Sequence, residues 1–244
     1  MRSEHVRVFQ TLPHPCGYYA QRTAQNLVID PAAPDLRQLY GPALERGFRR
    51  AGGHLYLPHC ANCRACTPCR IDVAGFRPDR AQKRCLRRNG DLCISAKAPG
   101  YTEERHRLYT AYLRARHAGG GMDEAEPSDF DRFLNASWSP TLFLEFRLGS
   151  RLLGVAVTDV CAGSLSAVYT FFDPELGARS LGTFAILQQV QLARRHKLPW
   201  LYLGFWIDGH PKMDYKRSFR PLQIRTAQGW QVMPSAPASA TQRC

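Results

Sequence analysis

The sequence contains no long uninterrupted apolar run, and its first residues lack the features of a secretory signal. No apolar run approaches the roughly 20 residues that a membrane-spanning helix needs. The N-terminal stretch, MRSEHVRVFQTLPHPCGYY, has neither an apolar core nor a small-residue cleavage site. We therefore expect no membrane partner and a cytoplasmic location. In that reducing compartment the nine cysteines are expected to be thiols or metal ligands, and not disulfides.

Acidic side chains are scarce relative to basic ones. The chain has 20 Asp and Glu against 33 Lys and Arg, and its net charge is +13. Such a surplus attracts polyanions, although a generally basic composition without a specific partner is the alternative. Segment 76–91, FRPDRAQKRCLRRNGD, concentrates the charge, and we interpret it as a site for a phosphate backbone. At helical spacing one side of it carries Arg77, Arg80, Arg84, Arg87 and Arg88.

A helix is predicted upstream of the cysteines. Apolar residues recur at three- and four-residue steps in segment 34–53. Gly41 and Pro42 are expected to break or kink this helix, and the pair Gly52-Gly53 is expected to end it. The basic helix and a strand, DLCISAK, come after the cysteines.

The second half has the pattern of an α/β layer with a mixed sheet. An amphipathic helix near residue 101 is followed by a loop at 119–129 and a short helix that Ser128 or Asp129 is expected to cap. Three strands, a long helix, a buried strand, a short helix and a final strand pair are predicted at 141–149, 151–160, 164–173, 180–198, 199–207, 212–219 and 221–233. This order resembles the GNAT acyltransferase fold.

The predicted fold class is therefore α/β, with a GNAT acyltransferase-like C-terminal domain and a small Cys-containing N-terminal α+β lobe. The expected boundaries are 1–98 for the N-terminal lobe, 99–233 for the C-terminal domain and 234–244 for a disordered tail.

Cysteines recur at three-residue steps in HCANCRACTPCR, as Cys60, Cys63, Cys66 and Cys69. Tetrahedral zinc sites normally draw on two short motifs separated by intervening chain, and the ferredoxin pattern requires a longer last step followed by proline. The spacing therefore argues against one site made by all of these cysteines. One interpretation is a structural zinc or iron–sulfur site formed by Cys16, Cys60, Cys63 and Cys66; reduced cysteines that only pack are the other.

Two later segments carry groups that suit an anionic ligand. In FFDPELGARSLGTFAIL a helix is predicted to begin at residues 180–183, just after Arg179. Free N–H groups at a helix start attract anions, although small residues there also let a helix pack on a sheet. In YLGFWIDGHPKMDYKRSF, Lys212, Lys216 and Arg217 follow a buried strand, near which clefts of α/β sheets lie. A solvated basic helix is the alternative.

Together these segments resemble the bacterial aspartate/glutamate leucyltransferases, a branch of the arginyl-tRNA–protein transferase family. The similarity covers roughly residues 10 to 230. The motifs that carry it are HPCGYY (14–19), GFRRAGGHLYLPHCANCRAC (47–66), FRPDRAQKR (76–84), AVTDV (156–160), YTFFDPELGARSLGT (169–183), WLYLGFWI (200–207) and KMDYKRSF (212–219).

The resemblance implies an enzyme that moves leucine from leucyl-tRNA to the N-terminal Asp or Glu of a protein and so marks that protein for degradation. No cofactor is required for this chemistry. In the family the position of Cys69 is usually aliphatic, which sets Cys69 apart from the candidate ligands.

The implied reaction is attack of a free α-amine on an activated ester, which needs placement and oxyanion stabilisation. We hypothesise that Asp173 orients or deprotonates the amine, that Tyr215 protonates the departing ribose hydroxyl, and that Lys216 is also catalytic. Arg70 or Arg77 would bind the acidic acceptor side chain. The residues expected to bind the tRNA and its aminoacyl end are Arg80, Arg84, Arg179, Ser180, Leu181, Gly182, Thr183, Lys212 and Arg217.

Other functions stay open at this point. The donor amino acid could be arginine, because only the resemblance to one branch selects leucine. An acetyl-CoA-dependent N-acetyltransferase would use the same fold, but ARSLGTFA places Phe184 where a second small residue of the pyrophosphate turn belongs. A zinc-ribbon nucleic-acid-binding module would account for the cysteines and the charge, but not for the acyltransferase-like half.

Overall fold

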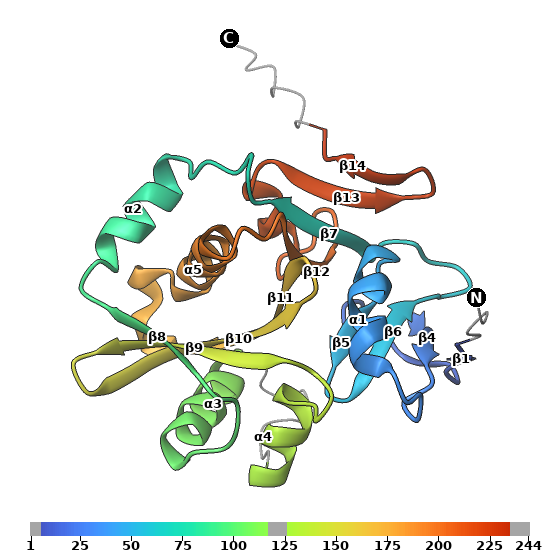
Figure 1. Ribbon diagram of the computed structural model, residues 1–244, viewed down its shortest axis with the longest axis horizontal. Helices are drawn as coiled ribbons and strands as arrows, with labels where there is room; N and C mark the ends of the chain where they lie inside the picture. The colour runs from blue at the N-terminus through green and yellow to red at the C-terminus, as the bar shows by residue number, and fades with distance from the viewer. Residues whose placement is uncertain (1–5, 117–125, 235–244) are drawn as a thin grey trace.

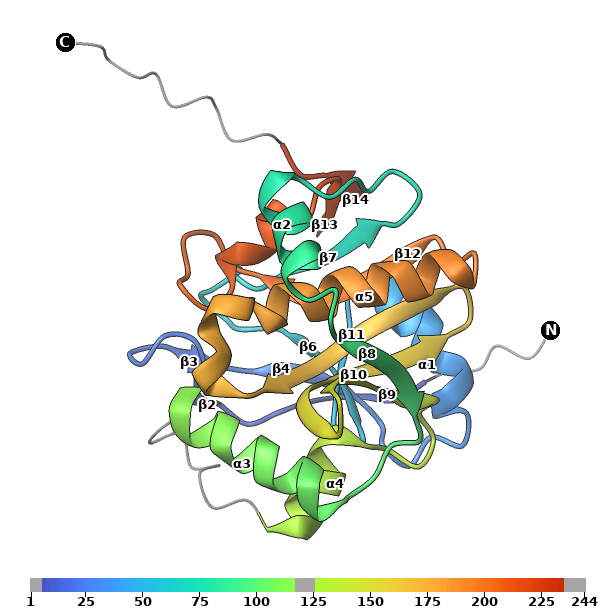
Figure 2. The ribbon, with the colours of Figure 1, turned by 90° about the vertical axis from the view of Figure 1, so that its left-hand side faces the viewer.

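A large mixed sheet runs through the molecule, and a smaller sheet with its own helix lies at one side (Figure 1). The computed structural model describes residues 6–116 and 126–234. Helix α5 (Leu181–Arg195) covers one face of the large sheet. Helices α3 (Glu103–Arg116) and α4 (Pro127–Leu134) cover the other face (Figures 1 and 2). The α/β class with a mixed sheet, as predicted from the sequence, is confirmed.

The large sheet has the strand order β14-β13-β7-β12-β11-β10-β9-β8. Its neighbours are antiparallel except β11 and β12, which are parallel. Strands from both sides of the expected boundary at residue 98 therefore share one sheet. The strands are β7 (Thr67–Asp72), β8 (Cys93–Lys97), β9 (Thr141–Leu148), β10 (Arg151–Cys161), β11 (Ser164–Phe172), β12 (Trp200–Trp206), β13 (Leu222–Thr226) and β14 (Gly229–Val232).

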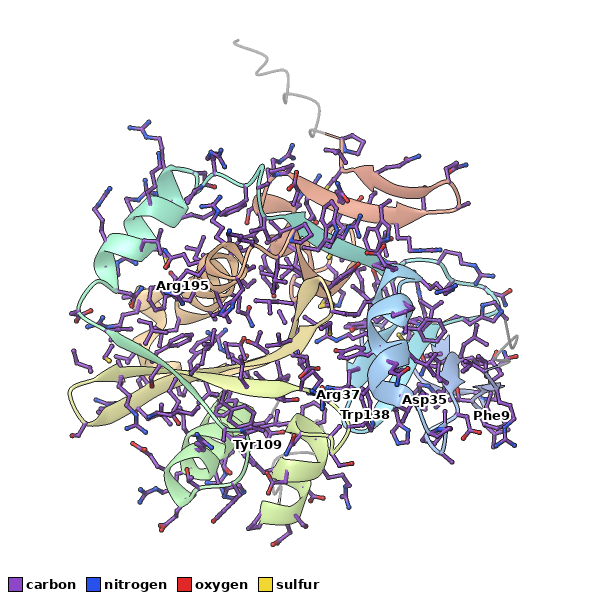
Figure 3. All side chains as sticks on the ribbon, viewed as in Figure 1. Phe9, Asp35, Arg37, Tyr109, Trp138 and Arg195 are labelled. Carbon is purple, nitrogen blue, oxygen red and sulfur yellow. The ribbon has the colours of Figure 1, made fainter. Side chains whose placement is uncertain are left out.

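The smaller sheet has the order β1-β4-β6-β5, and a two-stranded hairpin of β2 and β3 accompanies it. Its outer strand carries Phe9, which is half exposed at the edge of the molecule (Figure 3). The Cys-rich loop leads from β6 into β7 and so joins the smaller sheet to the larger one. The elements of this lobe are β1 (Val8–Gln10), β2 (His14–Pro15), β3 (Thr23–Ala24), β4 (Asn26–Ile29), α1 (Leu36–Glu45), β5 (Arg49–Ala51) and β6 (His54–Pro58).

The core divides into two layers because strand side chains alternate between the faces of the large sheet. On β9, Phe143 packs under α3 and α4, whereas Leu144 and Phe146 pack towards α5. Helix α5 contributes a nearly continuous set of buried apolar residues, including Leu181 and Phe184. None of the helices in the described ranges is long and apolar enough to span a membrane.

Three short helical segments complete the fold. They are α2 (Arg80–Arg88) and the 3-10 segments η1 (Pro174–Arg179) and η2 (Asp214–Ser218). Asp79 caps α2 by accepting a hydrogen bond from the backbone N–H of Gln82, whose side chain accepts one in return from the N–H of Asp79. This reciprocal capping sets the start of the basic helix predicted from the sequence.

The expected ends of the first helix are wrong in two respects. Helix α1 continues through Gly41-Pro42, because burial of Ala43 and Leu44 compensates for the hydrogen bond that proline cannot donate. It ends at Glu45, ahead of Gly47, which has a φ of +92° and leaves the helical region at no steric cost. Gly52 instead forms the turn between β5 and β6.

The cap of α4 also differs from the expectation. The N-cap is Glu126, and Pro127 occupies the first helical position, where its missing N–H is not needed. Asp129 lies in the first turn and accepts a hydrogen bond from the N–H of Glu126. Most of the loop predicted at 119–129 and nearly all of the tail predicted at 234–244 lie outside the described residues.

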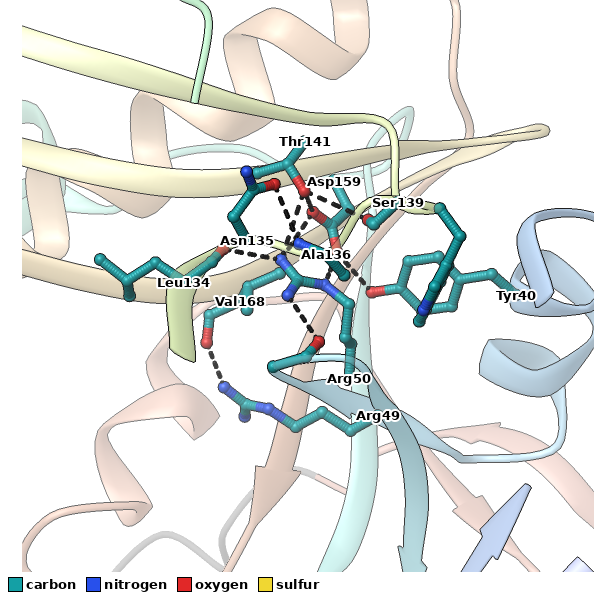
Figure 4. A network of polar contacts seen from close by, with 12 residues as sticks. Tyr40, Arg49, Arg50, Leu134, Asn135, Ala136, Ser139, Thr141, Asp159 and Val168 are labelled. Carbon is teal, nitrogen blue, oxygen red and sulfur yellow. Dashed lines mark hydrogen bonds and ion pairs between the residues drawn. The ribbon is translucent and has the colours of Figure 1, made fainter. Parts of the chain in front are cut away.

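A buried ion pair joins the two sheets (Figure 4). Arg50 of β5 binds Asp159 of β10 through Nε and Nη2 at 2.6 and 3.0 Å, and both side chains are fully buried. The same carboxylate accepts hydrogen bonds from Tyr40 of α1 and from Thr141 of β9. The guanidinium also donates to the carbonyl of Leu134 at the end of α4. Elements from all parts of the fold therefore meet at one carboxylate.

The variant Asp159→Asn should lower the free energy of unfolding by about 3–5 kcal/mol, because it leaves a buried guanidinium uncompensated. Urea unfolding followed by circular dichroism measures the change. The control is Glu103→Gln, which breaks the exposed pair of Glu103 with Arg107 and should cost no more than about 1 kcal/mol. Equal, small effects of the two variants would contradict the assigned role of the buried pair.

Candidate functional site: a gap between two parallel strands

Strands β11 and β12 separate soon after they begin. They pair only along residues 164–166 and 200–202, although β11 runs on to Phe172 and β12 to Trp206. A register irregularity between Tyr202 and Gly204, in the pairing of β12 with β7, accompanies the separation. Beyond this point the facing edges of β11 and β12 do not pair with each other. Their backbone groups therefore need partners other than the facing strand, which side chains or water can supply.

Arg49, at the start of β5, enters this gap. Its Nη2 donates a hydrogen bond to the carbonyl oxygen of Val168 on β11 (Figure 4). On the other side its guanidinium packs on Gly204 of β12, so closely that a Cβ atom there would overlap it. Gly204 has a φ of +75°, which only glycine adopts readily. The glycine in the aromatic strand WLYLGFW thus makes room for an arginine from the smaller sheet.

Lys216 of η2 lies on the β12 side of the gap. It is only 4% exposed, and its Nζ donates a hydrogen bond to the carbonyl oxygen of Phe205. Desolvation lowers the pKa of its ammonium group from 10.5 to about 8. Within this shift Cys69 opposes the fall of the pKa, and the positive charge of Arg49 contributes to it. Among the ion pairs of residues 6–116 and 126–234, none involves Lys216 or Arg49.

Tyrosines surround the two cations. Desolvation raises the pKa of Tyr18 and of Tyr215 to about 12. It also raises the pKa of Tyr56 and of Tyr169, and the charge of Arg49 opposes the shift in every case. The phenols therefore stay neutral at physiological pH, and Tyr215, which is 48% exposed, faces solvent. We call this group the paired-cation site; it consists of Arg49, Lys216, Tyr18, Tyr56, Tyr169 and Tyr215.

A cavity of about 270 Å³ adjoins the paired-cation site. It lies between the β2–β3 hairpin, the Cys-rich loop and β12, and its wall includes Tyr18, Tyr56 and Phe205. Arg22 and Arg64 are the charged side chains among its described lining residues, which include no Asp or Glu. The cavity and the paired-cation site together form a region of the protein that is positive and free of carboxylates.

The four predicted metal ligands all line this cavity: Cys16, Cys60, Cys63 and Cys66. Burial raises the pKa of Cys66 to about 12, and Cys16, Cys60 and Cys63 act in the same direction, as expected of neighbouring thiols. A hydrogen bond from the backbone of Ala65, and then the guanidinium of Arg22, lower the pKa of Cys63.

Thiols are suitable ligands for a soft metal, but in the structure these four side chains lie too far apart to bind one ion. In the described part of the chain no three Cys, His, Asp or Glu side chains come close enough together to hold an ion. Cys69, in contrast, is buried in the core of β7.

Two family models match the chain. One describes the N terminus of arginine-tRNA-protein transferases and matches residues 14–84. The other describes the C terminus of the same proteins and matches residues 104–226. The chain belongs to the arginine-tRNA-protein transferase family. Its N-terminal match contains Arg49 and the Cys-rich loop, and its C-terminal match contains Lys216, so both parts of the family contribute to the paired-cation site.

Full-length relatives place the chain within one branch of the family. Proteins named aspartate/glutamate leucyltransferase from Stenotrophomonas maltophilia strain K279a and from Xanthomonas euvesicatoria pv. vesicatoria are 54% and 53% identical to it. These matches cover 94% and 95% of this chain and the same shares of the relatives. The resemblance inferred from the sequence motifs is confirmed.

Two solved structures show a partial likeness to this chain. One is the C-terminal domain of a putative lysylphosphatidylglycerol synthetase from Agrobacterium fabrum, with a TM-score of 0.46 and 14% identity over 73% of this chain and 53% of that one. The other is L-PGS from Bacillus licheniformis, with a TM-score of 0.44 and 8% identity over the same shares.

Asp173, predicted to act on the amine, lies at the end of β11. One carboxylate oxygen accepts a hydrogen bond from the backbone N–H of Glu175 at 3.0 Å and so caps η1. The other oxygen pairs with Arg151. Both oxygens are therefore engaged in local structure, and the catalytic role of Asp173 stays a prediction.

The predicted anion site at residues 180–183 follows directly after η1. Ser180 has a φ of 54°, and Gly182 lies against the ring of Phe172 at the end of β11. Leu181 is fully buried, and Thr183 is half buried. The start of α5 thus lies beside the end of β11, while Arg179 turns away from it.

The basic residues predicted to bind tRNA have different surroundings. Arg80, Arg84 and Lys212 are exposed. Arg179 forms two hydrogen bonds of 2.8 Å with the carboxylate of Asp91. Arg217 pairs with two aspartates near η2.

The arginines predicted to bind the acceptor have other partners. Arg70 is buried, pairs with Glu45 at 2.8 Å and lies between the rings of Trp200 and Trp230, 3.6 and 4.3 Å from their centres. Arg77 donates hydrogen bonds to backbone carbonyls of its own loop. Arg49, which sequence reasoning missed, occupies the gap instead. The signal available was its place in the motif GFRRAGG.

The variant Lys216→Met should stabilise the folded protein at pH 7. Because the folded-state pKa is depressed from 10.5 to about 8, the unfolded chain binds a proton that the folded chain releases between these values. The cost of burying the ammonium, about 3 kcal/mol, is present in full below pH 8 and disappears as the pH rises to 10.5. In Lys216→Met, loss of the hydrogen bond to the carbonyl of Phe205 offsets about 1 kcal/mol of this stabilisation.

Urea unfolding at several pH values measures this change. We expect the free energy of unfolding of Lys216→Met to exceed that of the unmodified protein by about 2 kcal/mol at pH 7. This difference should become smaller as the pH rises above 8. Lys212→Met, which replaces an exposed lysine of the same region, should change the free energy of unfolding little at any of these pH values. A stabilisation that does not depend on pH would contradict the assigned pKa.

Proposed function

We propose that the protein is an aspartate/glutamate leucyltransferase of the cytoplasm. It would transfer leucine from leucyl-tRNA to proteins that begin with Asp or Glu and so mark them for degradation. The observation that carries this proposal is the paired-cation site, in which Arg49 and the buried Lys216 share a gap without a carboxylate. The names of the relatives support the donor and the acceptor.

The reaction joins the acceptor's α-amine nitrogen to the carbonyl carbon of the leucyl ester. A nitrogen–carbon bond forms, the bond from that carbon to the ribose oxygen breaks, and the ribose oxygen takes a proton. The α-ammonium of the acceptor must first lose a proton, with a pKa near ~8. The enzyme therefore needs a weak base for the amine and an acid for the ribose.

Lys216 and Tyr215 match these needs. The neutral amine of Lys216, with a pKa of about 8, can accept the proton from an α-ammonium of similar acidity. Tyr215, with a pKa raised to about 12, keeps its phenolic proton and can donate it to the ribose oxygen. Asp173 would act indirectly, because it accepts a hydrogen bond from the N–H of Glu175 and so holds η1 in place before the start of α5.

Selection of leucine over arginine follows from the missing carboxylates. An arginyl side chain needs a negative partner when it leaves water. The described lining of the cavity includes no Asp or Glu, and Arg49 and Lys216 are already positive. A neutral leucyl side chain suits this region, whereas a third cation would be repelled.

The exposed face of α2 suits the tRNA backbone. It carries Arg80, Lys83, Arg84, Arg87 and Arg88, all exposed. Gln82 of α2 donates a hydrogen bond to the carbonyl of Ser218 in η2, and Asn89 donates one to the carbonyl of Arg179 before α5. The basic helix is thus tied at one end to the segment that holds Lys216 and at the other to the start of α5. A tRNA lying along α2 would bring its acceptor end to the gap.

A metal bound by the cysteines would have only a structural role. We propose that Cys16, Cys60, Cys63 and Cys66 hold zinc or an iron–sulfur cluster, which would brace the Cys-rich loop against the hairpin of β2 and β3. Their shared cavity supports the idea, although in the described part of the chain their sulfurs do not lie close enough together to hold an ion. None of the steps above involves this group.

A transfer assay tests the function. Purified full-length protein is incubated with labelled leucyl- or arginyl-tRNA and peptides that begin with Asp, Glu, Lys or Ala. Leucine should appear on the Asp and Glu peptides only, and Lys216→Met should lower kcat by at least about 100-fold because the proton acceptor is lost. Transfer of arginine, or acetylation from acetyl-CoA without tRNA, would contradict the proposal.

Metal analysis tests the cysteines. Protein purified without oxygen should contain about one equivalent of zinc or a visible iron–sulfur absorption, and Cys63→Ser should lose it. Cys93→Ser, which changes an exposed cysteine outside the cavity, is the matched control. Absence of metal from both the unmodified chain and the control would contradict metal binding and leave the transfer chemistry untouched.

A further inference from the structure

Arg49 differs from most other shielded arginines of the protein. Buried and half-buried arginines elsewhere in the described ranges pair with carboxylates: Arg50, Arg70, Arg105, Arg147, Arg179 and Arg217. Arg225 lacks an ion pair, but its Nε donates to the backbone carbonyl of Glu45 at the surface of the sheet. Among these described arginines, Arg49 is the one that lacks a carboxylate partner and also lies in the gap between β11 and β12.

The guanidinium of Arg49 keeps donors for a ligand. A guanidinium carries five N–H groups in a planar fork that matches a carboxylate. Its hydrogen bond to the carbonyl of Val168 uses one N–H group on Nη2. Nη1 packs closely against the backbone of Gly204, and in the described part of the chain no hydrogen-bond acceptor is found for Nη1 or Nε.

The groups around Arg49 are suited to a negative ligand. The neighbours whose ionisation responds to its charge are phenols, a thiol and an ammonium group: Tyr18, Tyr56, Tyr169, Tyr215, Cys69 and Lys216. The site therefore offers positive charge and hydroxyl donors, and a bound carboxylate would meet no like charge from these neighbours. Such a site rejects a neutral isostere, because the isostere leaves the guanidinium unpaired.

We propose that Arg49 binds the side-chain carboxylate of the acceptor's first residue and so determines the preference for Asp and Glu. This inference rests on the function proposed above. In Asp and Glu the side-chain carboxylate and the α-amine are joined by a short carbon chain. A carboxylate held by Arg49 in the gap places the amine towards Lys216, whose ammonium group lies beside Phe205 of β12. Arg49 then binds the side chain of the acceptor's first residue, and Lys216 deprotonates the α-ammonium group of the same residue.

Arg70 does not compete for this role in the structure. Its Nη1 donates to Glu45 and Tyr202, its Nε donates to Gln223, and its flat faces are covered by indole rings. An acceptor carboxylate would have to displace Glu45. No such displacement is needed at Arg49.

The test compares peptides that differ only in charge at the first residue. The value of kcat/KM for leucine transfer is measured with tetrapeptides that begin with Asp, Asn, Glu or Gln, for the unmodified protein, Arg49→Gln and Arg49→Lys. In Arg49→Gln the value for the Asp peptide should fall about 10- to 100-fold, with little change for the Asn peptide. Arg49→Lys should lose part of the preference, because a lysine keeps the charge but not the fork.

Arg225→Gln is the matched control, since it removes another half-buried arginine without a carboxylate partner. It should keep the preference for Asp over Asn. If Arg49→Gln keeps that preference too, the inference is wrong while the proposed function stands. If the unmodified protein transfers leucine to none of the peptides, the proposed function itself fails.

A measurement on the unmodified protein covers the case in which both variants fail to fold. Phenylglyoxal modification of Arg49, followed by mass spectrometry, is carried out with and without the tetrapeptides. The Asp peptide should protect Arg49 and the Asn peptide should not. Equal modification in the presence of either peptide would overturn the inference.

Discussion

The ion pair between Arg50 and Asp159 determines where the neighbouring residue goes. In a strand, consecutive side chains point to opposite faces. Because Arg50 is bound to β10 on one side of β5, Arg49 must point to the other side, where β11 and β12 separate. One buried carboxylate thus attaches the smaller sheet to the larger one and also sets the direction of the arginine in the gap. Stability and the site depend on the same dipeptide of β5.

The paired-cation site is costly for the folded protein. Two positive groups lie near each other, one of them desolvated, and neither has a carboxylate partner among the described ion pairs. Backbone carbonyls of the separated strands give partial compensation, because each accepts a hydrogen bond from one cation. An anion bound between the two cations would relieve the remaining electrostatic repulsion, and this relief would contribute to its affinity. Arrangements of this kind are typical of functional sites and unusual in places that serve stability alone.

Local patterns in the sequence predict most of the elements, whereas the site depends on pairings between distant segments. The strands β9 to β12 and helix α5 follow from apolar periodicity. The end of α1 was misplaced because Gly47 and Gly52 both have positive φ, and only the tertiary structure decides which one ends the helix. Lys216 was found from its motif. Arg49 was missed because the gap arises from the register of β12 against β7, which no local pattern encodes. The stacking of Arg70 on Trp200 and Trp230 is equally non-local, and its role in acceptor binding stays a prediction.

The position of β7 affects how the chain can fold during its synthesis. This strand is made early, yet in the sheet it lies between β12 and β13, which are made last. At bacterial translation rates the roughly 130 residues between β7 and β12 take on the order of 10 s to emerge. Until then both edges of this largely buried strand lack partners, and unpaired strand edges are prone to wrong pairing. The nascent N-terminal part therefore cannot reach its final structure alone, and its completion depends on the last strands of the chain.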